Sequence, residues 1–394
     1  MLDGTGRIPT FVVTGFLGSG KTTLLRGVLH DPAFANTAVI VNEFGTVGLD
    51  HELLAHAQER TILMPGGCVC CSIREDVETT LRELLDRVDS GTLPRFDRLV
   101  IETTGLADPV PLLFTLHASP LAAARLRLES VIVTADGALG RTTLDRHAES
   151  TKQITVADRI VITKRDMAED ADVTALVEDL KQLNPWAEIE CRNLLTESPI
   201  DLFVGSQYNS GRDPAIVGRW TMGKLGSADG DGGRQASPTL HLPGNNHHTE
   251  KGVRGSAHAA SIRSFCVSYD HQTNWTGFGI WLTATLHRYG GQFLRIKGLL
   301  AVDGMPGPTV IHAVQHMVHP PLHLESWPSS DRTSRLVCIV QGLDAQSVER
   351  SLRAFTRIEP QIATRARSYR LAGAGGTVGG RPIRRATAPR WLKG

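Results

Sequence analysis

The sequence predicts an α/β protein in which a domain with a mostly parallel sheet is followed by a smaller α+β domain. Two observations predict this order. Up to about residue 204, short apolar runs rich in β-branched residues alternate with longer amphipathic stretches, which is the pattern of a parallel sheet covered by helices. From residue 262 onward, several strand-like runs are mixed with two helix-like stretches.

The strands predicted for the first domain are nearly all apolar, and each ends at a polar or glycine-rich turn: residues 10–14, 38–42, 99–102, 131–135 and 159–163. Such runs are typical of strands that are buried on both faces of a sheet. Sheets of this kind bind ligands at the loops that follow the carboxyl ends of their strands. We therefore expect the functional residues of the first domain, residues 1–204, in those loops.

The remainder of the chain divides into three parts. Residues 205–260 lack periodicity and are rich in Gly, Ser, Asp, Asn and His, which favours a flexible linker. The second domain, residues 261–356, is predicted to contain strands at 262–269, 293–302, 309–318 and 335–341, a helix at 275–289, and a helix at 345–355 capped by Asp344. Residues 357–394 are basic and rich in Gly and Pro, and we expect a disordered tail.

Composition excludes several classes of protein. Lys and Arg number 42 against 41 for Asp and Glu, so the chain has no overall charge that would favour nucleic acid as a specific partner. The apolar runs are too short for a membrane span, and the first residues lack the pattern of a signal peptide. We therefore expect a cytoplasmic protein. Three of the six cysteines lie within residues 68–71, which indicates a thiolate site rather than a disulfide framework.

A glycine-rich segment that follows the first predicted strand and opens a predicted helix matches the P-loop pattern G-x-x-x-x-G-K-T. In this context the pattern is a strong signal for phosphate binding by backbone N–H groups and a helix N-terminus. Lys21 would contact the β- and γ-phosphates, and the Thr22 hydroxyl would bind Mg²⁺. The nucleotide-binding residues predicted here are Gly15, Gly18, Ser19, Gly20, Lys21, Thr22 and Thr23.

Two further strand ends complete the predicted nucleotide site. Glu102 ends a buried strand, where its carboxylate would orient Mg²⁺ or its water shell. Thr163 ends a later strand, and Lys164 and Asp166 follow it, where Asp166 could accept two hydrogen bonds from guanine while the Lys164 stem covers the ring. Thr163 replaces the Asn that is usual in guanine-reading loops, but Asp166 still favours GTP over ATP. Taken singly, Glu102 and Asp166 could also be a helix cap or part of a surface ion pair.

Cys68, Cys70 and Cys71 precede a predicted helix N-terminus, where the helix dipole favours thiolates. Three sulfurs can occupy three corners of a tetrahedral site, with zinc as the first candidate and cobalt, iron or copper(I) as others. The absence of a fourth cysteine nearby suits a site that releases its metal. A redox dithiol or inert cysteines are the alternatives.

Taken together and in this order, these motifs resemble the CobW-like metal-associated GTPases, also called zinc-regulated GTPase metallochaperones. The resemblance extends to the second domain, which is expected to be of the CobW C-terminal type, through Arg295-Ile296-Lys297-Gly298 and Val314-Gln315-His316. It implies a slow GTPase, with Lys21, Thr22 and Glu102 as its catalytic residues and GTP and Mg²⁺ at the P-loop.

The resemblance also implies that Glu43 joins the three cysteines around Zn²⁺, and that the metal is delivered to a client apo-metalloprotein. Family members that act in cobalamin synthesis or nitrile hydratase activation share these motifs, so the client is left open, as is an oligomer. Two other functions also stay open: a nucleotide-dependent zinc sensor that delivers no metal, and a P-loop kinase or ligase.

Four histidines of the second domain have helix-like spacing: His312, His316, His319 and His323. Prolines 320 and 321 oppose a helix, so we interpret the four histidines as strand residues. In a strand, His312 and His316 would face away from His319. The isolated Cys191, Cys266 and Cys338 are predicted to be core residues.

Overall fold

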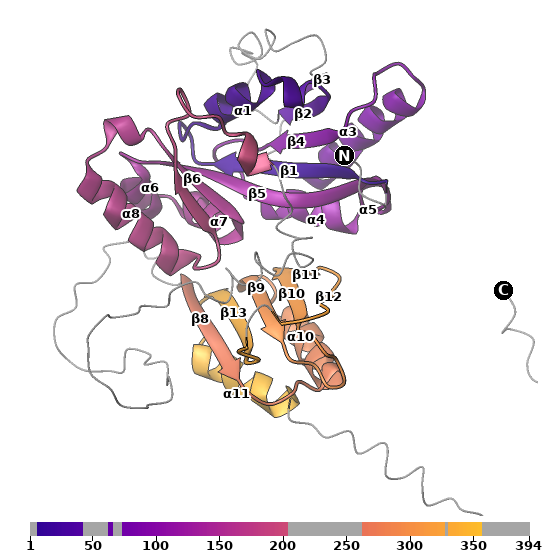
Figure 1. Ribbon diagram of the computed structural model, residues 1–394, viewed down its shortest axis with the longest axis vertical. Helices are drawn as coiled ribbons and strands as arrows, with labels where there is room; N and C mark the ends of the chain where they lie inside the picture. The colour runs from indigo at the N-terminus through magenta and orange to yellow at the C-terminus, as the bar shows by residue number, and fades with distance from the viewer. Residues whose placement is uncertain (1–5, 42–61, 66–72, 204–261, 328–329, 357–394) are drawn as a thin grey trace, which may run out of the picture. The chain divides into compact units, whose positions relative to one another are not determined.

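The computed structural model describes residues 6–41, 62–65, 73–203, 262–327 and 330–356 (Figure 1). These residues belong to one compact unit that ends at Arg357 and contains two sheets. The first sheet has seven strands and the second has six. The domain boundaries given above remain a prediction. Within the described ranges, no helix combines the length and the apolar character that crossing a membrane requires.

The first sheet is parallel throughout, which confirms the predicted fold class. Its strand order is β3-β2-β4-β1-β5-β6-β7, so β1 lies at the centre and the chain reverses its direction of winding there. Ligand-binding loops of such sheets cluster at this point. The strands are β1 (Ile8–Gly15), β2 (Thr37–Val41), β3 (Ile62–Pro65), β4 (Arg98–Glu102), β5 (Leu126–Asp136), β6 (Arg159–Thr163) and β7 (Glu188–Cys191).

Alternation along the strands gives the first sheet two buried faces. In β1, Phe11 and Val13 point into one cluster and Val12 points into the other. The cluster with Phe11 is covered by α1 (Lys21–Leu29) and the 3₁₀ helices η1 (Pro32–Phe34) and η3 (Ile200–Phe203). The opposite face is covered by helices that include α3 (Ile73–Asp89), α4 (Val110–Ala118), α5 (Pro120–Arg125), α6 (Gly140–Arg146), α7 (Ala148–Val156) and α8 (Asp170–Leu183).

The second sheet is antiparallel, with the order β11-β10-β9-β13-β8 and β12 paired to β10. Trp281, Phe278 and Leu352 pack its two helices against one face. As predicted, Asp344 caps the last helix by accepting a hydrogen bond from the Ser347 backbone N–H (2.8 Å). The elements are β8 (Ile262–Tyr269), α10 (Trp275–Tyr289), β9 (Phe293–Leu300), β10 (Thr309–Val314), β11 (Met317–Val318), β12 (Leu322–His323), β13 (Ser334–Gln341) and α11 (Ala345–Thr356).

The histidine prediction is confirmed for His312 and His323, which lie in β10 and β12, and is wrong for His316 and His319, which lie outside the strands. The single strand expected at 309–318 is a hairpin, because Gln315 adopts a positive φ of 49° and the chain turns back between Val314 and Met317. The turn pairs the backbones of His312 and His319, and their ring centroids lie 5.8 Å apart. No Gly, Asn or Asp marks the turn in the sequence, so the usual hairpin signal is missing.

The isolated cysteines differ from one another. Cys338 is buried as predicted, whereas Cys266 is partly exposed and Cys191, on edge strand β7, is exposed. Burial raises the pKa of the Cys338 thiol, so it behaves as an apolar core residue.

Candidate nucleotide site

The P-loop joins the central strand β1 to α1, as the sequence predicts. Gly15, Gly18 and Gly20 all have positive φ values, of 142°, 71° and 97°, a region that favours glycine. At Gly15 a Cβ atom would also come within 2.4 Å of the Thr134 hydroxyl oxygen. Helix α1 starts after Gly20 without a side-chain cap and without an acidic residue in its first turn. Its first N–H groups and its dipole therefore suit an anion.

Lys21 lies across this loop. Its ammonium group is buried and donates hydrogen bonds to the carbonyl oxygens of Gly15 (3.0 Å) and Phe16 (3.1 Å). The positive charge is thus held beside the segment whose backbone bends around the predicted phosphate site. Thr22 and Thr23 follow in the first turn of α1, where both are partly buried.

Short hydroxyl contacts tie the P-loop to neighbouring strands. The Ser19 and Thr134 hydroxyl oxygens lie 2.6 Å apart, which joins the loop to β5. Thr163, at the end of β6, donates to the Ser19 carbonyl oxygen at 2.7 Å. The departure from the usual Asn at position 163 therefore still leaves a side chain that holds the P-loop.

Three of the hydroxyl residues at this edge were not predicted from the sequence. Besides Thr134, the Thr103 hydroxyl donates to that of Thr14 at 2.7 Å and links β4 to β1. Each of the three lies within a residue or two of the carboxyl end of a buried strand. A hydroxyl at that position was the available signal.

Glu102 is buried at the end of β4, opposite Val13 of β1 and Val41 of β2. Its carboxylate therefore belongs to a strand that is hydrogen-bonded to the one leading into the P-loop. Carboxylate and threonine hydroxyl oxygens are hard ligands of the kind that Mg²⁺ prefers. The donor set of Thr22 and Glu102 thus fits this ion.

The predicted base-reading loop follows β6. Lys164 has a left-handed backbone (φ 51°), and its ammonium group lies 2.7 Å from the Asp136 carboxylate at the end of β5. Burial raises the pKa of Asp136, but the hydrogen bonds from Lys164 and from two backbone N–H groups outweigh it and lower the pKa below its usual value. Asp166 is exposed in η2 (Arg165–Met167), where a ligand can reach its carboxylate. Asp136 was not predicted, although it directly follows a predicted strand.

The predicted zinc ligands Glu43, Cys68, Cys70 and Cys71 lie outside the described residues. Helix α3 begins at Ile73, where the sequence predicts a helix after the triplet. Within the part of the chain that the structure describes, no group of three or more His, Cys, Asp or Glu side chains is arranged to hold a metal ion.

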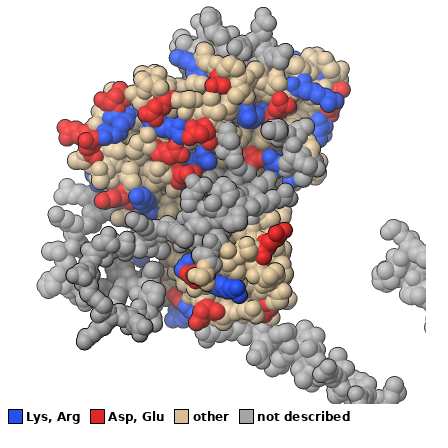
Figure 2. Space-filling model, in the orientation of Figure 1, with Lys and Arg blue, Asp and Glu red and all other residues tan. Residues whose placement is uncertain are grey.

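Charges on the visible face of the molecule are mixed. Figure 2 shows basic and acidic side chains interspersed over the part built on the parallel sheet. On the described part of this face they form no large area of one sign, in keeping with a net charge near zero.

Comparison with known proteins matches both parts of the chain. Residues 9–190 match the family described as the CobW/HypB/UreG nucleotide-binding domain, and residues 262–356 match the CobW C-terminal domain. The chain is 30% identical to the zinc chaperone YjiA of Escherichia coli, over 79% of this chain and 87% of that one. It is 29% identical to the zinc chaperone CobW of Pseudomonas aeruginosa, over 88% and 91% of the two chains.

The fold is shared with a crystal structure described as Zn(II)-bound YjiA GTPase from E. coli. The TM-score is 0.59 and the sequence identity 24%, with 89% of this chain and 99% of that chain covered.

Proposed function

This chain belongs to the CobW family of metal-associated GTPases, and on that premise we propose that it couples GTP hydrolysis to the delivery of zinc. The cargo would be held by Cys68, Cys70 and Cys71, with Glu43 as a further ligand. The recipient would be a client apo-metalloprotein. Both relatives reported above carry the name zinc chaperone, which supports the choice of metal.

The P-loop geometry is the observation that carries the nucleotide half of the proposal. The start of α1 has no side-chain cap, and the ammonium group of Lys21 contacts the carbonyl oxygens of the same loop; both would bind the phosphates. Thr22 and Glu102 would hold Mg²⁺, which supplies positive charge to the phosphate oxygens when it is bound. The exposed Asp166 would accept hydrogen bonds from guanine.

Chain order supports coupling between nucleotide and cargo. The cysteine triplet lies in the sequence between β3 and α3, and β3 is parallel to β1 in the same sheet. The strand before the triplet therefore ends at the same edge as the strand before the P-loop. Loops at this edge are the ones that P-loop switches reorganise when the γ-phosphate is lost.

A competitive zinc titration with and without a non-hydrolysable GTP analogue tests this function. We expect zinc affinity to depend on the nucleotide, and to fall by at least about a hundredfold when all three cysteines are replaced by Ser. Cys191→Ser is the matched control, because Cys191 is exposed elsewhere in the chain. The proposal is contradicted if the zinc affinity changes neither with the nucleotide nor with the triple substitution.

Transfer of zinc to an apo-enzyme then separates delivery from sensing. Transfer that is faster during GTP hydrolysis supports delivery. Nucleotide-dependent zinc binding without transfer would instead identify a sensor.

A further inference from the structure

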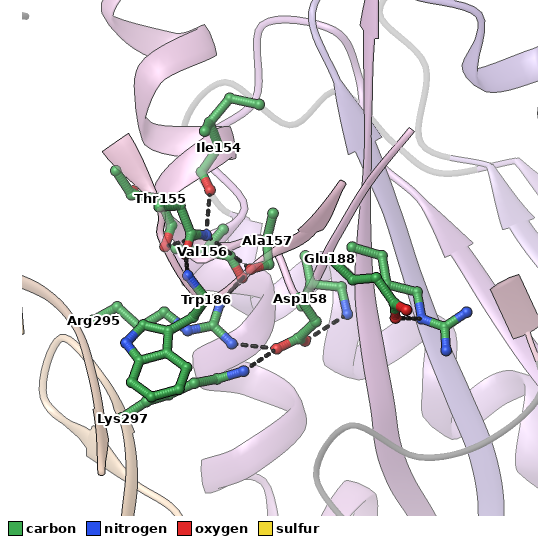
Figure 3. A network of polar contacts seen from close by, with 12 residues as sticks. Ile154, Thr155, Val156, Ala157, Asp158, Trp186, Glu188, Arg295 and Lys297 are labelled. Atoms are coloured by element: carbon green, nitrogen blue, oxygen red, sulfur yellow. Dashed lines mark hydrogen bonds and ion pairs between the residues drawn. The ribbon is translucent and has the colours of Figure 1, made fainter. Parts of the chain in front are cut away.

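The Arg295-Ile296-Lys297-Gly298 motif has a structural role that the proposed function does not use. Arg295 and Lys297 lie on β9, and both side chains are almost completely buried. They converge on one carboxylate of the first sheet's domain, that of Asp158 in the segment between α7 and β6 (Figure 3). Lys297 Nζ lies 3.1 Å from Asp158 Oδ1, and Arg295 forms an ion pair with the same oxygen. Asp158 also accepts a hydrogen bond from the Val131 backbone N–H (2.9 Å).

Arg295 also holds the carboxyl end of α7. Its guanidinium group donates to the carbonyl oxygens of Val156 and Ala157. Asn184 completes the cap from the end of α8, with hydrogen bonds to the carbonyl oxygens of Ile154 (2.8 Å) and Ala157 (2.9 Å). A cation at this position also complements the helix dipole. A side chain of the second sheet, Arg295, therefore helps to cap the carboxyl end of α7.

The same helix holds the loop that follows Glu102. Gln153 Nε2 donates to the carbonyl oxygens of Gly105 and Ala107, both at 3.1 Å. Lys152 pairs with Asp108 at 3.2 Å. Gln153 is buried, so its two hydrogen bonds are shielded from competing water.

That loop lies directly on the P-loop. A Cβ atom at Gly105 would come within 2.6 Å of the Leu17 backbone nitrogen, so the two backbones are in contact. At the start of α7, the His147 ring stacks on Phe16 of the P-loop with centroids 4.4 Å apart. Helix α7 thus contacts both loops that border the predicted phosphate site.

A cavity lies beside α7. It has a volume of about 140 Å³ and is bordered by the P-loop, the end of β5, and helices α6, α7 and α8. Gln153 and Ile154 of α7 are among its lining residues. Packed interiors resist displacement, and this cavity leaves unfilled space beside Gln153 and Ile154.

We propose that α7 couples the nucleotide site to the second sheet, with Gln153 as the residue that positions the loop after Glu102 and Arg295 as the residue that positions the helix end. A nucleotide with a γ-phosphate would shift this loop, and Gln153 would pass the shift to α7 and so to β9. The proposal rests on GTP binding by the P-loop but not on zinc delivery. Coupling of this kind is reciprocal, so changing the anchor on β9 must change how the site distinguishes GTP from GDP.

The test is the ratio of the affinities for a non-hydrolysable GTP analogue and for GDP, measured by titration of the full-length chain with Mg²⁺ present. We expect Arg295→Met and Gln153→Met each to change this ratio by at least about fivefold. We expect the double variant to change it no more than the larger single effect, because both residues act through the same helix. A purely structural role would weaken both affinities equally and leave the ratio unchanged.

Matched controls replace an Arg and a Gln that take no part in the series of contacts described above. Arg335→Met removes a partly exposed Arg of the same sheet that pairs with Asp331. Gln182→Met changes an exposed side chain on α8, whose backbone carbonyl accepts from Ser264. Both controls should keep the native ratio. If Arg295→Met does not fold, Lys152→Met tests the contact between loop and helix at a more exposed position, with a smaller expected change in the same direction.

Three outcomes overturn the proposal. The first is an unchanged ratio of the two nucleotide affinities in Gln153→Met and also in Arg295→Met, or in Lys152→Met if Arg295→Met does not fold. The second is strictly additive effects in the double variant. The third is a native protein that binds neither nucleotide, and only this one also refutes the proposed function.

Discussion

The carboxyl edge of the first sheet and the contact between α7 and β9 both contain buried polar side chains, but they use different chemistry. At the sheet edge many of the contacts are between neutral hydroxyl groups, such as Ser19 with Thr134 and Thr103 with Thr14, and the ion pair of Lys164 with Asp136 is partly exposed. Between α7 and β9 the contacts are between full charges, those of Asp158, Arg295 and Lys297. Hydroxyl groups cost little to bury when paired, whereas burying charges is expensive unless all partners are present.

The charged contact is also unbalanced, because one carboxylate faces two cations. Burial raises the pKa of Asp158, but the charges of Arg295 and Lys297 outweigh it and lower the pKa. For Lys297, burial and then the charge of Arg295 lower the pKa to about 7, against the opposing effect of Asp158. We therefore expect the hydroxyl contacts to tolerate single changes better than the charged cluster of Asp158, Arg295 and Lys297 does.

The largest effect is expected from Asp158→Asn, which removes the only acid in the described part of the cluster and leaves the two cations facing each other. Breaking a buried ion pair at one partner costs about 3–5 kcal/mol, so the free energy of unfolding in urea should fall by about that amount. Asp179→Asn makes the same change in the surface pair with Arg141, where about 0–1 kcal/mol is expected. Equal losses in the two variants would show that the cluster is no more sensitive than the surface.

A smaller loss is expected from Thr163→Val, which keeps the shape of the side chain but leaves the Ser19 carbonyl oxygen without this donor. An unsatisfied buried group costs about 1–3 kcal/mol, which should be measurable in the free energy of unfolding. Thr174→Val is the control, because the exposed Thr174 hydroxyl bonds only within its own helix. A loss for Thr163→Val as large as that for Asp158→Asn would remove the distinction between the two regions.

The smallest effect concerns His319, which lies near His117 of α4, His312 of β10, Arg295 and Lys297 of β9, and Asp158. Burial, and next the charge of His117, lower the pKa of His319 to about 3, from 6.5. The unfolded chain therefore takes up a proton below pH 6.5 that the folded chain refuses. This part of the stability is complete above pH 6.5 and is lost as the pH falls from 6.5 toward 3.

The corresponding variant is His319→Gln, which cannot titrate. At pH 5.5 the native protein should have lost about 1 kcal/mol through this residue, so the stability of the variant should depend less steeply on pH between 6.5 and 5. Urea unfolding at several pH values measures the slope. An unchanged slope would mean that His319 is protonated equally in both states.

Elements with a clear local pattern could be predicted from the sequence. Residues 159–163 and 275–289 were predicted to the residue, because local apolar patterns and clear boundaries define them. Strands β3 and β7 were missed: each has four residues, and β7 alternates Glu with other residues at the sheet edge. Both lack the long apolar run of a central strand.

At the candidate site, local patterns predicted the P-loop, Glu102 and the loop after β6. The hydroxyl contacts were not predicted, because Ser19 and Thr134 are 115 residues apart. The charged cluster was noticed only as a motif shared with a family. Nothing near Arg295 or Lys297 in the sequence indicates that their partner is Asp158, which lies 137 residues from Arg295.

The cavity beside α7 has a consequence for how the protein responds to hydrostatic pressure. Empty interior volume is removed when a chain rearranges to fill it, and hydrostatic pressure favours the state of smaller volume. If α7 takes up two positions, the one that fills the space of about 140 Å³ gains population as the pressure rises. Pressure alone would then populate one of the two positions of α7, without any nucleotide.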